Sequence, residues 1–257
     1  MNAFDQFAFV LVRPKSAGNI GSTARALKNM GFGDLRLVAP AVSSKSNAAH
    51  AMAVHANDVL AGTRAFATLG EAVADCQLTV GTTCRTGLYR EAVRPLREAA
   101  AELAEVSDAN RIAVIFGPED TGLTNRELKF CQRLITIPTS AEYQSINLAQ
   151  AVILCAYEIR LALASEPESS KEPASFAGAA EVDAAMERMK QSLLAIGFLA
   201  EENPEHIMFA LRGIFGRSGL TARELDIING IATQMKWVAS GGAATLEAKK
   251  ASGRKLR

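Results

Sequence analysis

The sequence predicts an α/β domain with a parallel sheet, followed by a small all-α domain. Three observations support this prediction. Short apolar runs of strand length alternate with helical segments over residues 1–164, a pattern typical of a parallel sheet covered on both faces. Residues 165–178 are rich in Ser, Pro, Glu and Lys, and such a stretch buries too little apolar surface to fold, so we expect a flexible linker there. Residues 179–240 contain helical patterns only.

The alternation begins with the apolar run Phe7–Val12, which has the length of a buried strand. A helix over 22–30 follows and ends at Gly31, because glycine favours the left-handed conformation found after helix ends. The next strand, 35–38, ends before Pro40. Alanine-rich residues 47–60 and residues 69–75 predict two further helices.

The second half of the alternation contains the expected strands 78–81, 112–116 and 134–137. A long helix over 88–106 should break near Pro95, because proline disrupts the helical hydrogen-bond pattern. Thr124 and Glu127 have the spacing of a capping box and predict a helix over 124–131. The most apolar helix is expected over 146–163, with Ser145 or Gln144 as its cap.

The C-terminal part predicts a three-helix bundle. Apolar residues fall at helical spacing between Val182 and Ile196, and helices are expected over 204–215 and from Thr221 to Trp237. Residues 241–257 form a basic tail that ends in five Lys and Arg residues: Lys249, Lys250, Arg254, Lys255 and Arg257.

The charge of the chain is nearly balanced in sum but segregated along its length. The 257 residues carry a formal net charge of +1, which argues against a polybasic nucleic-acid binder. The net charge is +1 over 1–165, −6 over 166–205 and +6 over 206–257. These segments are either solvated helix faces or, near the C-terminus, a basic surface for phosphates. Candidate contacts in the last segment are Arg212, Arg217 and Arg223.

Several classes of protein are excluded by missing motifs. The chain contains no P-loop, no H-E-x-x-H and no G-x-S-x-G motif, and with three histidines we expect no metal site. The four cysteines form no C-x-x-C pair, and a buried structural role is favoured for Cys84. No signal peptide or membrane-spanning run is present, so a cytoplasmic protein is expected.

Three polar or glycine-rich loops are expected at the carboxyl edge of the sheet, where parallel sheets bind ligands. The first, 17–25, has glycines at 18 and 21 before a helix and suggests an anion site. The second, 116–123, contains two glycines and two carboxylates, and the third, 137–147, is polar. Individually, each loop also fits an ordinary turn.

Together, the motifs resemble those of the SPOUT superfamily of RNA 2′-O-methyltransferases. The resemblance rests on N-x-G-x-x-x-R at 19–25, F-G-x-E-x-x-G-L at 116–123, and I-P at 137–138 followed by S-I-N at 145–147. E-Y-Q-S-I-N at 142–147 and L-R-G-I-F-G-R at 211–217 are most similar to the enzymes that methylate cytidine or uridine 32 in the tRNA anticodon loop. The resemblance implies a deep trefoil knot at the C-terminal end of the α/β domain, a tRNA-binding role for 179–240, and a homodimer.

The resemblance also implies S-adenosyl-L-methionine (AdoMet) as the consumed methyl donor and assigns roles to residues. Arg25 would orient the ribose hydroxyl through an RNA phosphate, and Asn19, Ser145 and Asn147 would hold the loop and the hydroxyl. Glu119 is expected to brace the knot. The residues implied in cofactor binding are Thr82, Thr83, Cys84, Gly117, Glu119, Gly122, Ile137, Gln144, Ser145 and Ile146.

Three alternatives remain open. An enzyme of the same superfamily could act on another RNA, such as ribosomal RNA. A dinucleotide-dependent oxidoreductase fits the first glycine loop, although the third glycine and the acidic ribose partner of the fingerprint are missing. A non-catalytic RNA-binding module would bind tRNA without transferring a methyl group. The sequence leaves open which tRNAs are substrates, whether both pyrimidines are methylated, what accepts the proton and what the basic tail does.

Overall fold

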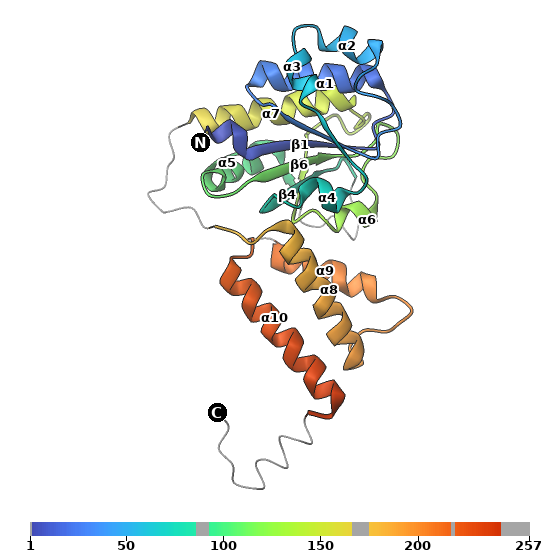
Figure 1. Ribbon diagram of the computed structural model, residues 1–257, viewed down its shortest axis with the longest axis vertical. Helices are drawn as coiled ribbons and strands as arrows, with labels where there is room; N and C mark the ends of the chain where they lie inside the picture. The colour runs from blue at the N-terminus through green and yellow to red at the C-terminus, as the bar shows by residue number, and fades with distance from the viewer. Residues whose placement is uncertain (1, 86–92, 166–174, 217–218, 243–257) are drawn as a thin grey trace.

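The computed structural model describes residues 2–85, 93–165, 175–216 and 219–242. Within these residues, seven parallel strands form one sheet with the order β3-β2-β1-β6-β4-β7-β5, which confirms the predicted parallel α/β domain (Figure 1). The strands are β1 Phe7–Val12, β2 Asp34–Val38, β3 Arg64–Phe66, β4 Leu78–Thr82, β5 Val93–Pro95, β6 Ile112–Phe116 and β7 Arg133–Thr136.

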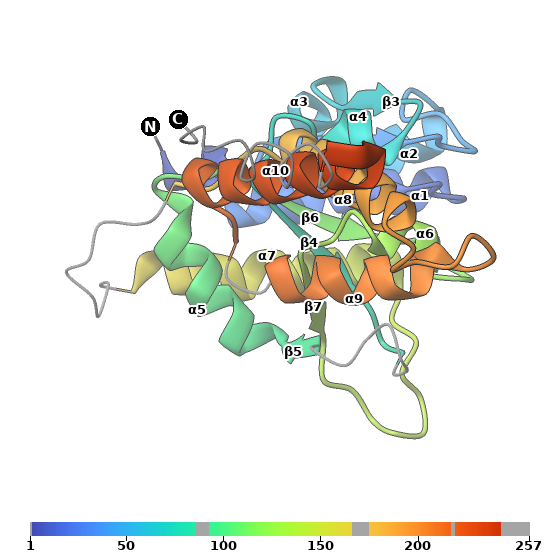
Figure 2. The same cartoon turned by 90° about the horizontal axis from the view of Figure 1, so that it is seen from below.

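Helices cover both faces of this sheet. A short 3-10 helix, Ala3–Gln6, precedes β1. The helices of the α/β domain are α1 Ala17–Met30, α2 Asn47–Ala53, α3 Asn57–Ala61, α4 Leu69–Val73, α5 Leu96–Ser107, α6 Asn125–Leu128 and α7 Leu148–Ala164. Helices α1, α2, α3, α5 and α7 pack on one face, and α4 and α6 pack on the other (Figure 2).

The central strand β1 shows how the sequence builds this double-sided core. Phe7, Phe9 and Leu11 belong to the core on one face, whereas Ala8 and Val10 belong to the core on the other. All six residues of β1 are buried, because strands covered on both faces are apolar at every position.

Several predicted boundaries were wrong, each for a local reason. The expected helix 47–60 is two helices, broken at Val54, whose φ is +54°. The helix expected over 88–106 begins only at Leu96, with Pro95 as its N-cap and the short strand β5 before it. Residues 88–92 of that prediction lie outside the described residues. The capping box of Thr124 and Glu127 is confirmed, but α6 ends after one turn.

The amino edge of the sheet is closed by a network of five charged side chains. Arg36 is 1% exposed and contacts Asp34 at 2.7 Å and Asp75 at 2.5 Å. Arg111 and Arg64 contact the same Asp34 at 2.5 and 3.1 Å. Although burial opposes ionisation, hydrogen bonds from Arg36, Arg111 and Arg64 lower the pKa of Asp34 to about 2. The buried carboxylate is therefore kept ionised by cations from three neighbouring segments.

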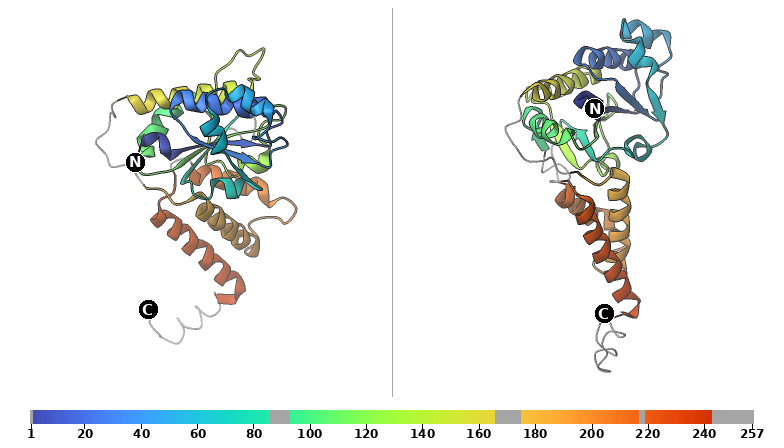
Figure 3. Two further views of the ribbon diagram at one scale, coloured as in Figure 1. Left: turned by 45° about the horizontal axis from the view of Figure 1, so that its top comes forward. Right: turned by 60° about the vertical axis from the view of Figure 1, so that its left-hand side comes forward.

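The C-terminal domain is the predicted helical bundle, formed by α8 Ala179–Ala195, α9 Pro204–Gly216 and α10 Ala222–Trp237 (Figure 3). A final π-helical turn, Val238–Gly242, follows. The capping box of Thr221 and Glu224 opens α10 as expected. The bundle has a core of its own that includes Met186, Met189 and Leu225.

The end of the expected flexible linker is packed against both domains. The backbone N–H of Phe176 donates to Asn110 of the α/β domain at 2.7 Å, and that of Ala177 donates to Leu220 of the bundle at 2.6 Å. Phe176 is buried because its ring fills the space beside Gly219. The prediction of a linker over 165–178 was therefore wrong for 175–178. Residues 166–174, and 243–257 of the basic tail, lie outside the described residues.

Candidate cofactor and active site

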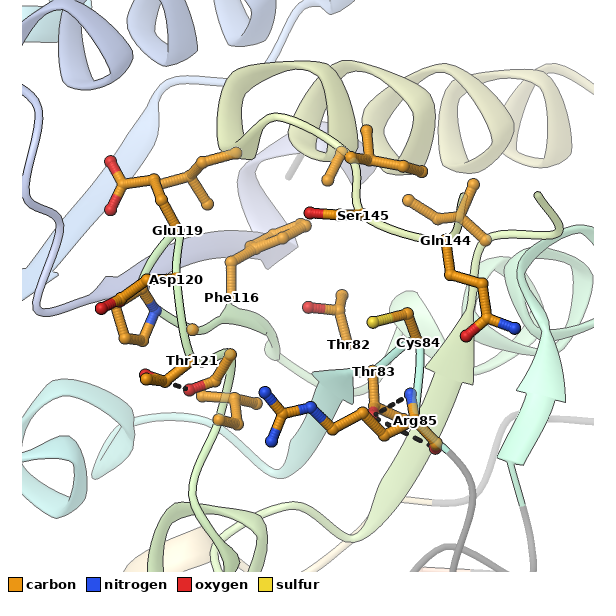
Figure 4. A pocket seen from close by; sticks show the side chains of 18 residues that line it. Thr82, Thr83, Cys84, Arg85, Phe116, Glu119, Asp120, Thr121, Gln144 and Ser145 are labelled. Atoms are coloured by element: carbon orange, nitrogen blue, oxygen red, sulfur yellow. Dashed lines mark hydrogen bonds between the residues drawn. The ribbon is translucent and has the colours of Figure 1, made fainter. Parts of the chain in front are cut away.

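A cavity of about 280 Å³ lies at the carboxyl ends of β4, β6 and β7. Figure 4 shows Thr82, Cys84, Phe116 and Ser145 around its centre. The loops that follow these three strands form most of the lining. The lining runs from Thr82 in β4 to Ala151 in α7, 69 positions further along the chain. The lining includes the ten residues that the resemblance implies in cofactor binding: Thr82, Thr83, Cys84, Gly117, Glu119, Gly122, Ile137, Gln144, Ser145 and Ile146.

The loop after β6 owes its shape to two glycines. A Cβ atom on Gly117 would lie 2.2 Å from the carbonyl carbon of Gly122 and from the amide nitrogen of Leu123. Gly122 has a φ of +62°, a conformation that glycine adopts at little cost. The loop therefore folds tightly back on itself and exposes backbone groups to the cavity.

Glu119 in this loop is held by α1 and the segment before it. Its carboxylate accepts hydrogen bonds from Asn19 Nδ2 at 2.8 Å and from the backbone N–H groups of Lys15 and Ser16 at 3.0 and 3.2 Å. Partial burial tends to raise the pKa of Glu119, but these hydrogen bonds outweigh it and lower that pKa below its ordinary value. In Figure 4 the carboxylate points away from the centre of the cavity. Glu119 is thus an ionised brace between the loop and α1.

Asn147 links the third loop to the same brace. Its side-chain oxygen accepts from the backbone N–H groups of Ala149 and Gln150, so Asn147 is the N-cap of α7. The expectation that Ser145 or Gln144 caps this helix was wrong, because the helix begins two residues later than predicted. Asn147 Nδ2 also donates to Asn19 Oδ1 at 3.1 Å. Asn19, Asn147 and Glu119 therefore join the first, second and third loops.

The predicted first loop is in fact part of a helix. Helix α1 begins at Ala17, with Ser16 as its N-cap, so the glycine-rich residues 17–21 form its first turns. Gly21 is required by packing, because a Cβ there would lie 2.0 Å from the carbonyl oxygen of Ala49 in α2. The prediction of a glycine loop over 17–21, which also suggested an oxidoreductase, is therefore wrong.

Arg25 lies about two turns into α1, and its side chain is exposed. It does not line the cavity. Within the described part of the chain, no hydrogen bond or ion pair holds its guanidinium. The structure thus joins Asn19 and Asn147 and puts Ser145 in the cavity wall, but it leaves Arg25 on the outer face of α1.

The cysteines divide into two groups. Burial raises the pKa of the Cys76, Cys131 and Cys155 thiols, so these residues act as packing groups. Cys84 is exposed and lines the cavity, which corrects the expectation that it is buried. Its strand ends at Thr82, so the residue lies in the open loop beyond the sheet.

Several lining residues were not among the predicted ones. Arg85, Phe116, Asp120 and Thr121 also face the cavity. Their positions in the sequence could have identified them, since each of the four is next to a predicted lining residue. Asp120 is paired with Lys15 at 2.6 Å and adds a further tie to the start of α1.

The three predicted RNA contacts have different surroundings. Arg212 on α9 pairs with Asp183 of α8 at 2.8 Å and is 19% exposed, so it ties two helices of the bundle together. Arg223 is exposed near the start of α10. Arg217 lies outside the described residues.

The described residues show neither a metal-binding cluster nor a membrane-spanning helix. They contain no group of three His, Cys, Asp or Glu side chains placed to hold a metal ion. Over the same residues, no helix combines the length and the apolar character needed to cross a membrane.

The sheet and the cavity at its carboxyl edge define an α/β protein with a ligand-sized site at the ends of its strands. Residues 6–157 match the SpoU rRNA Methylase family, and residues 180–249 match the C-terminal domain of the tRNA methyltransferase TrmJ. The chain belongs to the SpoU methylase family and, within it, to the TrmJ methyltransferases. This confirms the resemblance drawn from the three motifs.

Individual relatives match along nearly the whole chain. The tRNA (cytidine/uridine/adenosine-2′-O-)-methyltransferase TrmJ of Pseudomonas aeruginosa is 38% identical, over 92% of this chain and 96% of that protein. The tRNA (cytidine/uridine-2′-O-)-methyltransferase TrmJ of Escherichia coli is 36% identical, over 91% and 97%. The crystal structure of TrmJ from Z. mobilis superposes with a TM-score of 0.77 at 32% identity, covering 89% of this chain and 98% of that one.

Proposed function

We propose that this protein transfers a methyl group from AdoMet to a ribose 2′-OH of tRNA, at cytidine or uridine 32 of the anticodon loop, in the cytoplasm. The observation that carries the proposal is the cavity at the ends of β4, β6 and β7. The ten residues implied by motifs in separate parts of the chain line it together. Two relatives named as tRNA 2′-O-methyltransferases support the choice of substrate.

The residues of the cavity fit AdoMet by their chemistry. Phe116, Leu123 and Ile146 offer apolar surface, and Thr82 and Ser145 add hydroxyl groups to the lining. At Gly117 the backbone of Gly122 and Leu123 approaches so closely that no side chain fits, which keeps this loop compact beside the cavity. Backbone groups of the three loops would bind the adenine and the amino-acid end by hydrogen bonds. When bound, AdoMet supplies a methyl group made electrophilic by the sulfonium.

The chain's own residues have then to position the acceptor and release one proton. A guanidinium is protonated at neutral pH, so Arg25 is unsuited to act as a base. We assign Arg25 to the RNA phosphate next to the target ribose. Its planar guanidinium can bind that phosphate through two parallel hydrogen bonds. The proton would leave through that phosphate. Asn19, Ser145 and Asn147 would hold the third loop and the hydroxyl.

A homodimer with a knotted domain completes the proposal. Helices α1 and α7 pack side by side, and α7 exposes the apolar side chains of Leu154, Tyr157 and Leu161. Such a row on an otherwise polar surface suits an interface between two copies, and Arg25 on α1 would lie near it. The chain passes from β5 at the sheet edge to β6 in the interior of the sheet and then forms β7 between β4 and β5. This strand order is compatible with the trefoil knot that the family resemblance implies.

The test is incubation of the protein with labelled AdoMet and either total tRNA or ribosomal RNA, followed by mapping of the modified ribose. We expect label in tRNA at a 2′-oxygen. Label confined to ribosomal RNA would favour the alternative substrate, and tRNA binding without transfer would favour a non-catalytic module. Arg25→Lys keeps the charge but loses the fork, so methyl transfer should fall at least about tenfold while AdoMet still binds. An unchanged rate would remove Arg25 from the mechanism.

A further inference from the structure

A second and larger cavity, about 550 Å³, lies between the two domains. Its walls are β5, β7 and α5 of the α/β domain and α9 of the bundle; Figure 2 shows α9 beside β7, with α5 and β5 next to them. We call this cavity the interdomain groove. None of the residues assigned to cofactor binding lines it, so it is separate from the site already described.

The groove combines an apolar floor with an excess of positive charge. Leu134 of β7 and Phe209 and Ile214 of α9 line it, and Ile214 is 54% exposed. Such exposed apolar surface is costly in water unless something covers it.

The charges of the groove come from four cations and one carboxylate: Arg94, Lys129, Arg133, Arg212 and Glu102. Two of the cations are neutralised by carboxylates from the bundle, Lys129 by Glu205 and Arg212 by Asp183. Arg94 and Arg133 share the single carboxylate of Glu102. Among the described residues, these four cations have three carboxylate partners, Glu102, Asp183 and Glu205, so one positive charge remains unbalanced.

This surplus charge is centred on a buried arginine that is incompletely bonded. Arg133 is 13% exposed and donates to Glu102 through Nη1 at 3.1 Å. Its Nε is buried and, within the described part of the chain, has no hydrogen-bond partner. Burial and the neighbouring Arg94 lower the pKa of Arg133 below its ordinary value. Two cations that share one carboxylate favour a bound anion, which would offset the surplus charge beside Arg133.

The position of the groove relates it to the cofactor cavity. Strand β7 leads from one to the other. Residues Arg133 to Ile135 of the strand line the groove, and Ile137, just after the strand, lines the cofactor cavity. A ligand that extends from the cofactor cavity into the groove would need an apolar group for the apolar side chains and an anionic group for the surplus positive charge. Single-stranded RNA has both, as a nucleobase and a phosphate.

We propose that the interdomain groove binds an unpaired nucleotide of the RNA substrate, with a phosphate between Arg94 and Arg133 and a base against Leu134, Phe209 and Ile214. This rests on the proposed function, since it names a second contact for the same tRNA. The groove would give the bundle a direct share in substrate selection, through α9.

The test compares tRNA binding by Arg94→Gln with that of a matched control. Arg94 is 55% exposed, and its removal leaves Glu102 paired with Arg133, so no carboxylate is orphaned. Arg97→Gln is the control, because Arg97 is an exposed arginine on the same segment that pairs with Glu158 outside the groove. We expect Arg94→Gln to raise the Kd for tRNA about tenfold and to reduce the salt slope by about 0.7, as for one lost phosphate contact on a single strand. Arg97→Gln should stay within about twofold of wild type.

Ile214→Ala tests the base contact separately. It should weaken tRNA binding about threefold without changing the salt slope, since no charge is lost. AdoMet affinity, measured by calorimetry, should be the same in all three variants. Wild-type tRNA affinity in both Arg94→Gln and Ile214→Ala, with normal methyl transfer, would overturn the groove proposal and leave the proposed function standing. A wild-type protein that binds AdoMet but no tRNA would overturn both.

Discussion

The two edges of the sheet both carry charged networks, but they differ in the space beside these networks. At the amino edge, Arg36 and its partners fill the end of the sheet, and Arg36 is 1% exposed. At the carboxyl edge, Glu119 is tied to Asn19 and the start of α1, and a cavity of about 280 Å³ lies beside it. The difference lies in the loops, since Gly117 lets the loop after β6 fold tightly on itself beside the cavity. A charged cluster therefore marks a site only where the backbone leaves room.

This comparison predicts that damage at the amino edge reduces stability and that damage at the carboxyl edge reduces ligand binding. Arg36→Leu should have the largest effect on stability. It removes the buried cation that joins the partly buried Asp34 to the half-exposed Asp75, and breaking a buried ion pair costs about 3–5 kcal/mol. Denaturant unfolding measures the loss. AdoMet affinity of the protein that remains folded should be unchanged, and a large loss of affinity would show that the two edges are coupled.

Gly117→Ala should have the largest effect on the cofactor. The added methyl would meet the backbone of Gly122 and Leu123 at 2.2 Å, so the loop must move. We expect the Kd for AdoMet to rise at least about 100-fold, or about 2.7 kcal/mol, as measured by calorimetry. Gly33→Ala is the matched control, because no atom lies within 4 Å of its added methyl. Equal AdoMet affinity in both variants would separate the loop from the cofactor site.

The amino edge also predicts a pH dependence of stability. The pKa of Asp34 is lowered from 3.8 to about 2 in the folded protein, so the folded state favours the ionised form. This stabilisation is present above the unfolded-state pKa and is lost as the pH falls through the folded-state value. A difference of this size corresponds to roughly 2 kcal/mol. Asp34→Asn should flatten the stability profile between about pH 4 and pH 2 relative to wild type, and an unchanged profile would mean that another group dominates.

Asn19→Ala should have the smallest effect of the four. It removes one hydrogen bond to Glu119 and the acceptor for Asn147, but Asn19 lies outside the cavity wall. We expect AdoMet affinity to fall about fivefold, near the 1 kcal/mol typical of one hydrogen bond. Asn29→Ala, at an exposed position of the same helix, is the control. A loss as large as that of Gly117→Ala would mean that Asn19 contacts the cofactor directly.

Much of the fold could be predicted because apolar run length and spacing determine it locally. The five longer strands were predicted, whereas β3 and β5 were missed, since three-residue strands at the sheet edges leave little apolar signal. Glycines at 18 and 21 suggested a loop, but Ser16 caps a helix there and Gly21 allows α2 to pack closely. Sequence alone does not reveal such a neighbour from another segment.

The convergence of the three loops could be predicted for a similar reason, since parallel strands bring their carboxyl ends to one edge. The state of individual arginines could not. The pairing of Arg212 with Asp183 joins residues on different helices, and the exposure of Arg25 depends on what packs against α1. Counting charges over 206–257 therefore overstated the free basic surface.

The most direct measurement uses one tRNA substrate prepared with either cytidine or 2′-deoxycytidine at position 32, incubated with labelled AdoMet. The account predicts that the cytidine tRNA takes up one methyl group, at the 2′-oxygen of that residue, and that the deoxy tRNA, which binds but lacks the acceptor, takes up none. Equal labelling of the two tRNAs would contradict the proposed acceptor, and labelling of neither, with AdoMet bound in the cavity, would contradict the proposed reaction on tRNA.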